Sequence, residues 1–409
     1  DVFGTGKTAI KVSLNRYTQD LSLLANSGGS QLSNFTSSAS RSWTDSNGNF
    51  YPDCDFINPA AQNLTATGGD RCGAFTGGSA NFNLAIPTSV NDKDVVSGFN
   101  HRGYNWEFST SVQQELVPRR VAVDVAFFRR WYGNFTVTDN FNVAATDYSP
   151  FSIVVPVDSR LPLSGQTIDG FLDINANKSG QPTDDHVRFA SNYGKYEEYW
   201  QGFDVSTSVR PGAGTLIQGG FSMGGARSDT CEVNAKVPET STPVSSLTGA
   251  PGNIGAPLGR PFCKNSQPYL TQVKALGSYT IPKIDVQIGA TFQSVPGPQL
   301  TASYAAPAAD VVGLGRALDG TPSTITVNLA SPGTIYGDRL YQTDFRVGKV
   351  IRFAGNRRLT TSIDLFNLFN GNAVLTQSST YSITNAQSWG TPTSVQQPRL
   401  LKFTVNLNY

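Results

Sequence analysis

The last eleven residues, 399–409, constrain the fold of this chain more than any other stretch. They read RLLKFTVNLNY and alternate strictly between apolar and polar side chains, which is the period of a half-buried β-strand. The apolar positions are Leu401, Phe403, Val405, Leu407 and Tyr409, and the polar positions are Lys402, Thr404, Asn406 and Asn408. A soluble sandwich uses such strands, but a final strand that ends on an aromatic residue is typical of a transmembrane barrel.

The same alternation recurs along the chain and predicts ten strands. Residues 7–17 form the first strand and 399–409 the last. Four predicted hairpins lie between them, each with a short break: 104–116 with 121–127, 196–210 with 214–225, 272–281 with 284–294, and 340–353 with 358–370. Short turns therefore join every second pair of strands.

The other connections are long, and they are rich in Ser, Gly, Asn and Thr. They cover residues 18–103, 134–195, 230–271, 295–339 and 371–398. A soluble sandwich would mix turn lengths at both ends, and a propeller would repeat about every 40–50 residues. Alternating short and long connections instead predict an all-β, antiparallel, up-and-down transmembrane barrel with short periplasmic turns and long extracellular loops.

Composition agrees with a barrel and excludes two other classes. No run of eighteen apolar residues occurs in the 409-residue chain, which excludes helical membrane spans. The net charge of +1 gives no electrostatic argument for a nucleic-acid partner. The chain begins at Asp1 without an initiator Met or a signal peptide, so we expect either a processed exported protein or a portion of a longer one.

Polar side chains on one face of the strands predict a wet barrel lumen. The positions of interest are Asp124, Asp344, Arg346 and Asp364. Arg346 and Asp364 lie at similar distances from the turn of the last hairpin, so we expect them to pair across it. A polar interior implies water or a polar plug inside the barrel.

Four cysteines form two local pairs in loop-like sequence: Cys54 with Cys72, and Cys231 with Cys263. Neither pair has CxxC spacing or histidine neighbours, so free or metal-binding thiols are disfavoured. Two loop disulfides formed in an oxidising compartment are the expectation.

One loop segment has the spacing of a cation site. Oxygen-bearing side chains alternate along it at Asp45, Asn47, Asn49, Tyr51 and Asp53. This pattern resembles the first half of a calcium loop, although Phe56 stands where a bidentate Glu would end an EF-hand. The alternative is an Asx-rich turn pinned by a disulfide. A structural calcium is thus the only candidate cofactor.

Signals for catalysis are poor. The two histidines, His101 and His186, lie in or beside predicted loops without a nucleophile motif, and no phosphate-binding Gly-rich loop precedes a helix. An enzyme is therefore not expected. Nine aromatic residues cluster near the loop ends of the strands, where they predict a membrane-interface belt or, alternatively, a stacking surface for a carbohydrate or aromatic ligand. These are Trp106, Phe127, Phe128, Trp131, Tyr132, Phe135, Tyr196, Tyr199 and Trp200.

Several of these stretches resemble the C-terminal barrel of TonB-dependent outer-membrane receptors, in particular the Oar-like group that carries a carboxypeptidase-regulatory-like domain. The resemblance rests most specifically on SIDLFNLFN at 362–370 followed by the final strand KFTVNLNY. It extends to YNWEFSTSVQQELVPRRVAVDVAFFRRWYGN (104–134), EEYWQGFDVSTSVR (197–210) and DRLYQTDFRVGKVIRF (338–353). The resemblance implies a 22-stranded barrel, an N-terminal plug and a TonB box driven by the proton-motive force.

The chain departs from that pattern because it contains about ten strands and neither a plug nor a TonB box. We expect a C-terminal portion whose missing plug and N-terminal strands are elsewhere; a small autonomous barrel is the alternative. By resemblance, the receptor would lie in the outer membrane of a Gram-negative bacterium, contact its lipid and work with TonB, ExbB and ExbD. It would import a scarce small-molecule or peptide ligand captured by the extracellular loops. The alternative function is an adhesion or scaffold barrel that binds other proteins without transport.

Overall fold

The protein is described here by a computed structural model. The structure describes residues 4, 6–19, 40–75, 89–179, 183–240, 260–319, 324–353, 357–385 and 388–408. Tyr409, the predicted terminal aromatic residue, lies outside these ranges.

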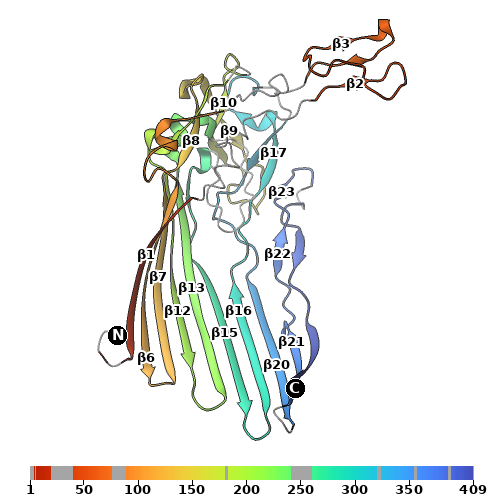
Figure 1. Ribbon diagram of the computed structural model, residues 1–409. Coiled ribbons are helices and arrows are strands. Elements are labelled where there is room, and N and C mark those ends of the chain that lie inside the picture. Colours follow the sequence, from red (N-terminus) through yellow and green to blue (C-terminus); the bar gives the residue numbers. More distant parts are fainter. Residues whose placement is uncertain are drawn as a thin grey trace.

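Ten antiparallel strands form one open, curved sheet in which each strand pairs with its neighbours along the chain (Figure 1). The strands in order are β1 (Thr8–Thr18), β6 (Tyr104–Val117), β7 (Val121–Gly133), β12 (Glu197–Val209), β13 (Thr215–Asp229), β15 (Leu270–Ile281), β16 (Val286–Val295), β20 (Leu340–Arg352), β21 (Arg358–Phe366) and β25 (Leu400–Asn408). A short strand, β14 (Lys264–Ser266), adds to β13. The predicted ten strands and the all-β, up-and-down topology are confirmed.

The end of β21 differs from the prediction because two residues there have positive φ angles, which a β-strand excludes. The alternation predicts one strand over 358–370, but β21 ends at Phe366. Asn367 and Asn370 have φ angles of 49° and 54°, and the buried amide of Asn367 donates to the carbonyls of Gly371 and Gln397. The Asn-Leu-Phe-Asn step is therefore a turn held by side-chain hydrogen bonds.

The register separates the side chains into two faces. Ile10, Val112, Val125, Val205 and Phe221 occupy directly opposed positions from β1 to β13 and form one row of an apolar outer face. The next residues along each strand form a polar inner face. Many of the outer side chains are exposed, including Phe403 at 69% and Val405 at 70%.

Tight turns and long connections occupy opposite ends of the sheet, as Figure 1 shows. The turns at the lower end use residues that tolerate a left-handed backbone or lack a side chain. Gly214 has φ 77° before β13, and Lys283 and Asp285 have φ 71° and 49° between β15 and β16.

The long connections contain small sheets of their own. These are β5 (Val90–Asn91), β11 (Asp185–Phe189) and β8 (Thr136–Asn140); β10 (Thr167–Ile174), β9 (Tyr148–Val154) and β18 (Val311–Val312); β19 (Thr324–Asn328), β17 (Ser303–Pro307) and β23 (Thr380–Tyr381); β2 (Trp43–Thr44), β4 (Arg71–Cys72) and β3 (Gln62–Asn63); and β22 (Val374–Gln377) with β24 (Pro392–Val395). Two short helices, α2 (Lys93–Val96) and α3 (Cys231–Lys236), and several 3-10 turns complete them.

The main hydrophobic core of the described residues lies in these connections and not on the large sheet. Ile153, Phe262, Leu329 and Trp389 belong to one buried cluster although they come from four different connections. Strand pairing joins the same segments, because β9 pairs with β18 and β17 with β23. We call this assembly of the described residues within the connections 134–195, 260–271, 295–339 and 371–398 the loop cap.

The large sheet has two edges that no described strand pairs: the free edge of β1 and that of β25. Within the ranges that the structure covers, no helix is long and apolar enough to cross a membrane.

Candidate functional site

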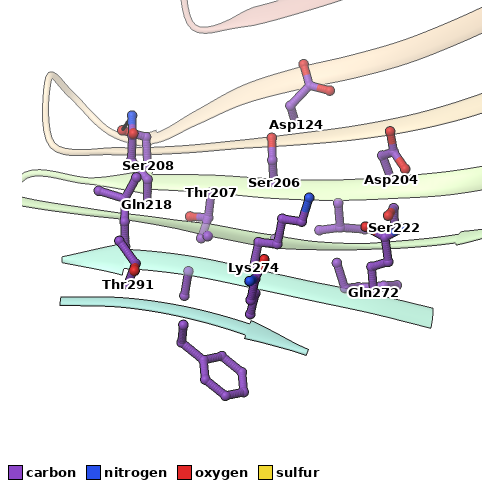
Figure 2. Close-up of a pocket in the computed structure, with 18 of the residues that line it drawn as sticks. Asp124, Asp204, Ser206, Thr207, Ser208, Gln218, Ser222, Gln272, Lys274 and Thr291 are labelled. Atoms are coloured by element: carbon purple, nitrogen blue, oxygen red, sulfur yellow. Dashed lines mark hydrogen bonds between the residues drawn. The ribbon is translucent and has the colours of Figure 1, made fainter. Parts of the chain in front are cut away.

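A cavity of about 670 Å³ lies on the large sheet, and all of its lining residues belong to the strands of that sheet. Strands from β6 to β20 contribute to its walls, and its polar lining comes from the inner face. The main polar side chains are Asp124, Asp204, Ser206, Lys274, Gln293 and Asp344. Figure 2 shows Asp124, Asp204, Ser206 and Lys274 extending to the same side of the strands. The volume falls in the range of sites for small ligands.

Register explains how distant residues reach this cavity. Asp124 opposes Ser206, Ser206 opposes Gly220, and Gly220 opposes Lys274. Three strand spacings of roughly 4.8 Å therefore separate Asp124 from Lys274, too far for an ion pair. Among the described residues, neither Asp124, Asp204 nor Lys274 has an ion-pair or hydrogen-bond partner. The cavity thus presents two unpaired carboxylates and one unpaired ammonium group to a ligand or to water, beside the hydrogen-bonded carboxylate of Asp344.

The predicted lumen-facing residues fall into two groups on this inner face. Asp124 and Asp344 line the cavity, and Asp344 accepts hydrogen bonds from Gln342 and from the backbone N–H of Asn367. Arg346 and Asp364 lie directly opposite each other, with Nε to Oδ1 at 3.4 Å. The predicted pairing across the last hairpin is present in the structure.

The indole of Trp200 lies on the inner face, nearer the loop cap than the cavity. The indole of Trp200 lies over Gly202 and Gly224, where a Cβ atom on Gly202 would come within 2.7 Å of the ring. Trp200 opposes Arg130, whose guanidinium pairs with Glu107. Glycine at these two positions is therefore required for the indole to lie flat on the wall.

The predicted aromatic cluster is divided by the register between the two faces. Trp106, Trp131 and Tyr199 are directly opposed on the outer face, and the two indoles stack with centroids 6.3 Å apart. Phe128, Tyr132 and Trp200 lie on the inner face. Phe135 and Tyr196 stack on each other at 4.0 Å beside the strand ends. Phe127 also lies on the outer face, opposite Phe203. A membrane-interface belt stays a prediction for the outer-face residues, and Trp200 lies on the face opposite to such a belt.

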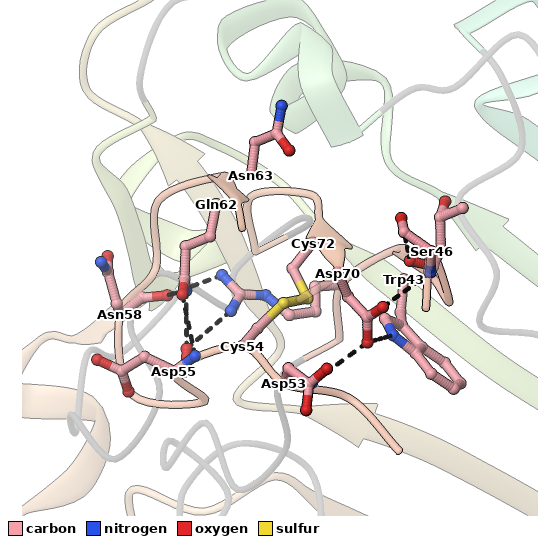
Figure 3. The surroundings of a disulfide bond; sticks show 12 residues. Trp43, Ser46, Asp53, Cys54, Asp55, Asn58, Gln62, Asn63, Asp70 and Cys72 are labelled. Carbon is pink, nitrogen blue, oxygen red and sulfur yellow. Dashed lines mark hydrogen bonds between the residues drawn. A yellow bond between two sulfur atoms is a disulfide. The ribbon is translucent and has the colours of Figure 1, made fainter. Parts of the chain in front are cut away.

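A disulfide-linked module, residues 40–75, contains the predicted cation segment (Figure 3). The carboxylate of Asp45 accepts the N–H groups of Gly48 and Phe50 at 2.7 and 3.0 Å. Asn47 accepts from Asn49 N–H, Asn49 accepts from Tyr51 N–H, and the Asn47 amide donates to Asp53. These contacts are successive Asx turns, the alternative to a calcium loop. Calcium binding there stays a prediction. It is tested by calorimetric titration of calcium into the intact protein and, for comparison, into an Asp45→Asn variant.

The central residue of this module is one that the sequence pattern does not single out. Asp70 is fully buried and accepts hydrogen bonds from the Trp43 indole at 2.9 Å and from the N–H groups of Ser46 and Asp53. The Trp43 bond is the main reason that the pKa of Asp70 lies below its ordinary value. Its position two residues before Cys72 is the only signal of its role in the sequence.

The second disulfide, Cys231–Cys263, joins the start of α3 to the segment before β14. The backbone N–H of Thr230 also donates to the carbonyl of Cys263 at 2.9 Å. Both predicted disulfides are therefore present in the structure, and both lie in long connections.

His186 links two of the long connections. Its ring nitrogens lie 3.3 Å from Asp92 and 3.1 Å from Asp184, and its ring stacks on Phe141 at 4.0 Å. Arg188 binds Asp92 at 2.6 Å. Burial acts to raise the pKa of Asp92, but hydrogen bonds from Arg188 and His186 outweigh it and hold that pKa below its ordinary value. This contact connects the segment before α2 to β8 and β11.

No protein-family model matches the chain, and no curated protein matches it. The solved structures to which the chain is similar include the following three. The ferripyoverdine receptor of the Pseudomonas aeruginosa outer membrane is 11% identical, with a TM-score of 0.36 over 74% of this chain and 27% of the receptor. The Escherichia coli outer membrane transporter YddB is 12% identical, with a TM-score of 0.36 over 75% and 32% of the two chains. The E. coli ferric-catecholate import receptor Fiu is 12% identical, with a TM-score of 0.34 over 80% and 30%. The chain therefore spans about a third or less of the length of the structures it matches.

Proposed function

We propose that this chain forms part of the wall of a TonB-dependent receptor in the outer membrane of a Gram-negative bacterium. The observation that carries the proposal is the division of the sheet into a mainly apolar outer face and a polar inner face with a cavity. A soluble sheet buries its apolar face, whereas a transmembrane barrel turns that face to lipid and keeps the polar face wet.

The dimensions of the outer face support membrane insertion. Along β7, outward residues are apolar from Val121 to Phe127; Arg129 follows, and Trp131 lies near the loop end. Val121 and Trp131 are ten residues apart, about 33 Å along a strand at roughly 3.3 Å per residue. A strand tilt of about 40° reduces this to about 25 Å, the height of the apolar band in outer-membrane barrels.

The two free edges of the sheet support a larger barrel. Edge N–H and C=O groups of β1 and β25 lack partners among the described strands, and in a bilayer such groups need partners. Further strands and a plug would supply them, consistent with a 22-stranded barrel. TonB, ExbB and ExbD follow from the sequence resemblance, as does import of a scarce ligand. The loop cap is suited to capturing that ligand.

Membrane insertion is tested by single cysteines at adjacent positions on opposite faces. The four cysteines of this chain are in disulfides, so within it only an introduced thiol reacts with a water-soluble maleimide. In outer membranes that contain the intact protein, we expect Val125→Cys to be shielded and Asp124→Cys to react. Equal labelling of both thiols in the folded protein would contradict a membrane-embedded outer face.

Transport is tested by following every compound in the culture medium, so that the ligand need not be chosen in advance. The medium is compared between the wild-type bacterium, a strain that lacks the gene, and wild-type cells treated with a protonophore. A receptor would deplete at least one compound from the medium only in energised wild-type cells. Identical media in all three cultures, under conditions in which the protein is present at the surface, would argue against import.

One observation favours an adhesion barrel as the second candidate. The disulfide-linked module exposes Phe50 and Ile57 at 88% each, with Tyr51 and Phe56 also exposed. Exposed apolar side chains on a rigid surface module are typical of protein-binding sites. Surface binding of a partner protein that persists in protonophore-treated cells, without depletion of any compound, would favour this function.

A further inference from the structure

The outer face ends toward the loop cap in a row of arginine and aromatic side chains. Arg16 of β1 opposes Trp106, Trp106 opposes Trp131, Trp131 opposes Tyr199, and Tyr199 opposes Arg227. Arg129 lies two residues closer to the short turns on β7. We call these six residues the arginine rim.

The aromatic rings hold two of the guanidinium groups. The Arg16 guanidinium lies 3.9 Å from the ring centre of Tyr104 and 5.7 Å from that of Trp106. The Arg129 guanidinium lies 4.8 Å from the ring centre of Tyr199. Stacking of this kind covers one side of a guanidinium plane and leaves its N–H edge available to a ligand.

Several of these donors lack acceptors. In the part of the chain that the structure describes, Nε and Nη2 of Arg16 and Nε of Arg227 are buried and have no hydrogen-bond partner. By contrast, Arg339 near the same end of the sheet donates to Ser294 and to the Thr271 carbonyl. An unpaired buried donor is costly, so these groups would gain from an acceptor that displaces the side chains now covering them.

The charge around the rim is positive. Glu197 and Asp229 lie one step closer to the loop cap, but Lys195 pairs with Glu197 at 2.6 Å and Lys264 approaches Asp229 at 4.0 Å. The charges of these two lysines and two carboxylates cancel, so the three arginines of the rim carry the excess positive charge. Toward the membrane centre, Leu14, Phe108 and Phe203 are apolar outer positions, whereas Gln201, which opposes Arg129, is polar and donates to the Tyr269 hydroxyl.

We propose that the arginine rim binds the phosphate of an anionic lipid in the leaflet nearest the loop cap. This inference rests on the proposed membrane location. Arginine offers paired donors that match phosphate oxygens, and the apolar rows below the rim accommodate the acyl chains of the same molecule. A free anion would gain the first contact without the second, so the surface fits a lipid.

The test uses the intact protein in nanodiscs of phosphatidylcholine, with phosphatidic acid as the added anionic lipid. The triple variant Arg16→Gln/Arg129→Gln/Arg227→Gln removes the rim. A control, Arg120→Gln/Arg210→Gln/Arg357→Gln, removes the same charge at the short-turn end. We expect native mass spectrometry to show phosphatidic acid binding weakened at least about tenfold in the rim variant and little changed in the control.

Three outcomes would overturn the proposal. They are undiminished binding of phosphatidic acid to the rim variant, an equal loss of this binding in both triple variants, and displacement of bound phosphatidic acid by inorganic phosphate as effectively as by phosphatidic acid itself. The first excludes the rim, the second indicates general electrostatic attraction, and the third indicates a free-anion site. Maleimide labelling of Val125→Cys, introduced into the wild type and into each triple variant, tests the membrane location separately from the lipid site. A shielded thiol with unchanged lipid binding refutes the rim alone, whereas a reactive thiol refutes the location itself.

Discussion

At the scale of single residues, Asp158 and Arg160 show how a charge pair fixes part of the loop cap. The hydrogen bond from Arg160 is the main cause that lowers the pKa of Asp158 to about 2. Because the folded-state pKa is depressed, this contact stabilises the cap above the ordinary pKa of about 3.8 and loses its effect as the pH falls through about 2. Arg160 also lies 5.4 Å from the ring centre of Trp389.

We therefore expect the fluorescence of Trp389 to change between about pH 4 and pH 2. The signal is isolated as the difference between the wild-type protein and a Trp389→Phe variant. In an Arg160→Gln background, the change should move to higher pH because Asp158 loses the group that holds its pKa down. An unshifted transition would show that another group controls this region.

Trp200 and Gly224 give a second prediction at this scale. A Cβ on residue 224 would come within 2.8 Å of indole carbon Cε2, so Gly224→Ala should destabilise the protein by about 1–3 kcal/mol. Gly277 on β15 is the matched control, because a Cβ there meets nothing within 4 Å. Unfolding in urea measures both variants. If overlap with the indole is the cause, Trp200→Ala should relieve much of the Gly224→Ala penalty.

At the scale of elements, the Cys231–Cys263 bond closes a segment of the chain 32 residues long against the end of β13. Replacing both cysteines with serine should lower the stability of this part of the protein by about 2–4 kcal/mol, because the unfolded segment gains freedom. Limited proteolysis of the connection between β13 and β15 measures the effect. Cleavage elsewhere in the protein serves as the internal control, and it should not accelerate. Unchanged cleavage of this connection would show that the packing of Val233 and Val237 alone holds it.

At the scale of the whole molecule, the open sheet leads to a prediction about its edges. In the intact protein, the edge amides of β1 and β25 should exchange hydrogen as slowly as those of central β12, because further strands pair with them. In the isolated 409-residue chain, the same amides should exchange rapidly while β12 stays protected. Hydrogen exchange read by mass spectrometry tests both states. Rapid edge exchange in the membrane-inserted intact protein would contradict a closed, larger barrel.

The sequence by itself determined the ten strands, their two faces and the pairing of the cysteines. These features are local: side chains alternate with a period of two residues, and the hairpin turns are short enough to fix each partner. Arg346 and Asp364 could be matched from their distances to one turn for the same reason.

Only the tertiary structure decided which aromatic residues meet across strands, how the connections pack and which carboxylate is buried. The alternation assigns Trp131 to the outer face, but only pairing with β6 and β12 places it between Trp106 and Tyr199. The core that joins Ile153 to Leu329 unites residues far apart in a chain with no periodic signal between them. Asp70 is buried because a disulfide and an indole converge on it, and such convergence has no signature in the sequence.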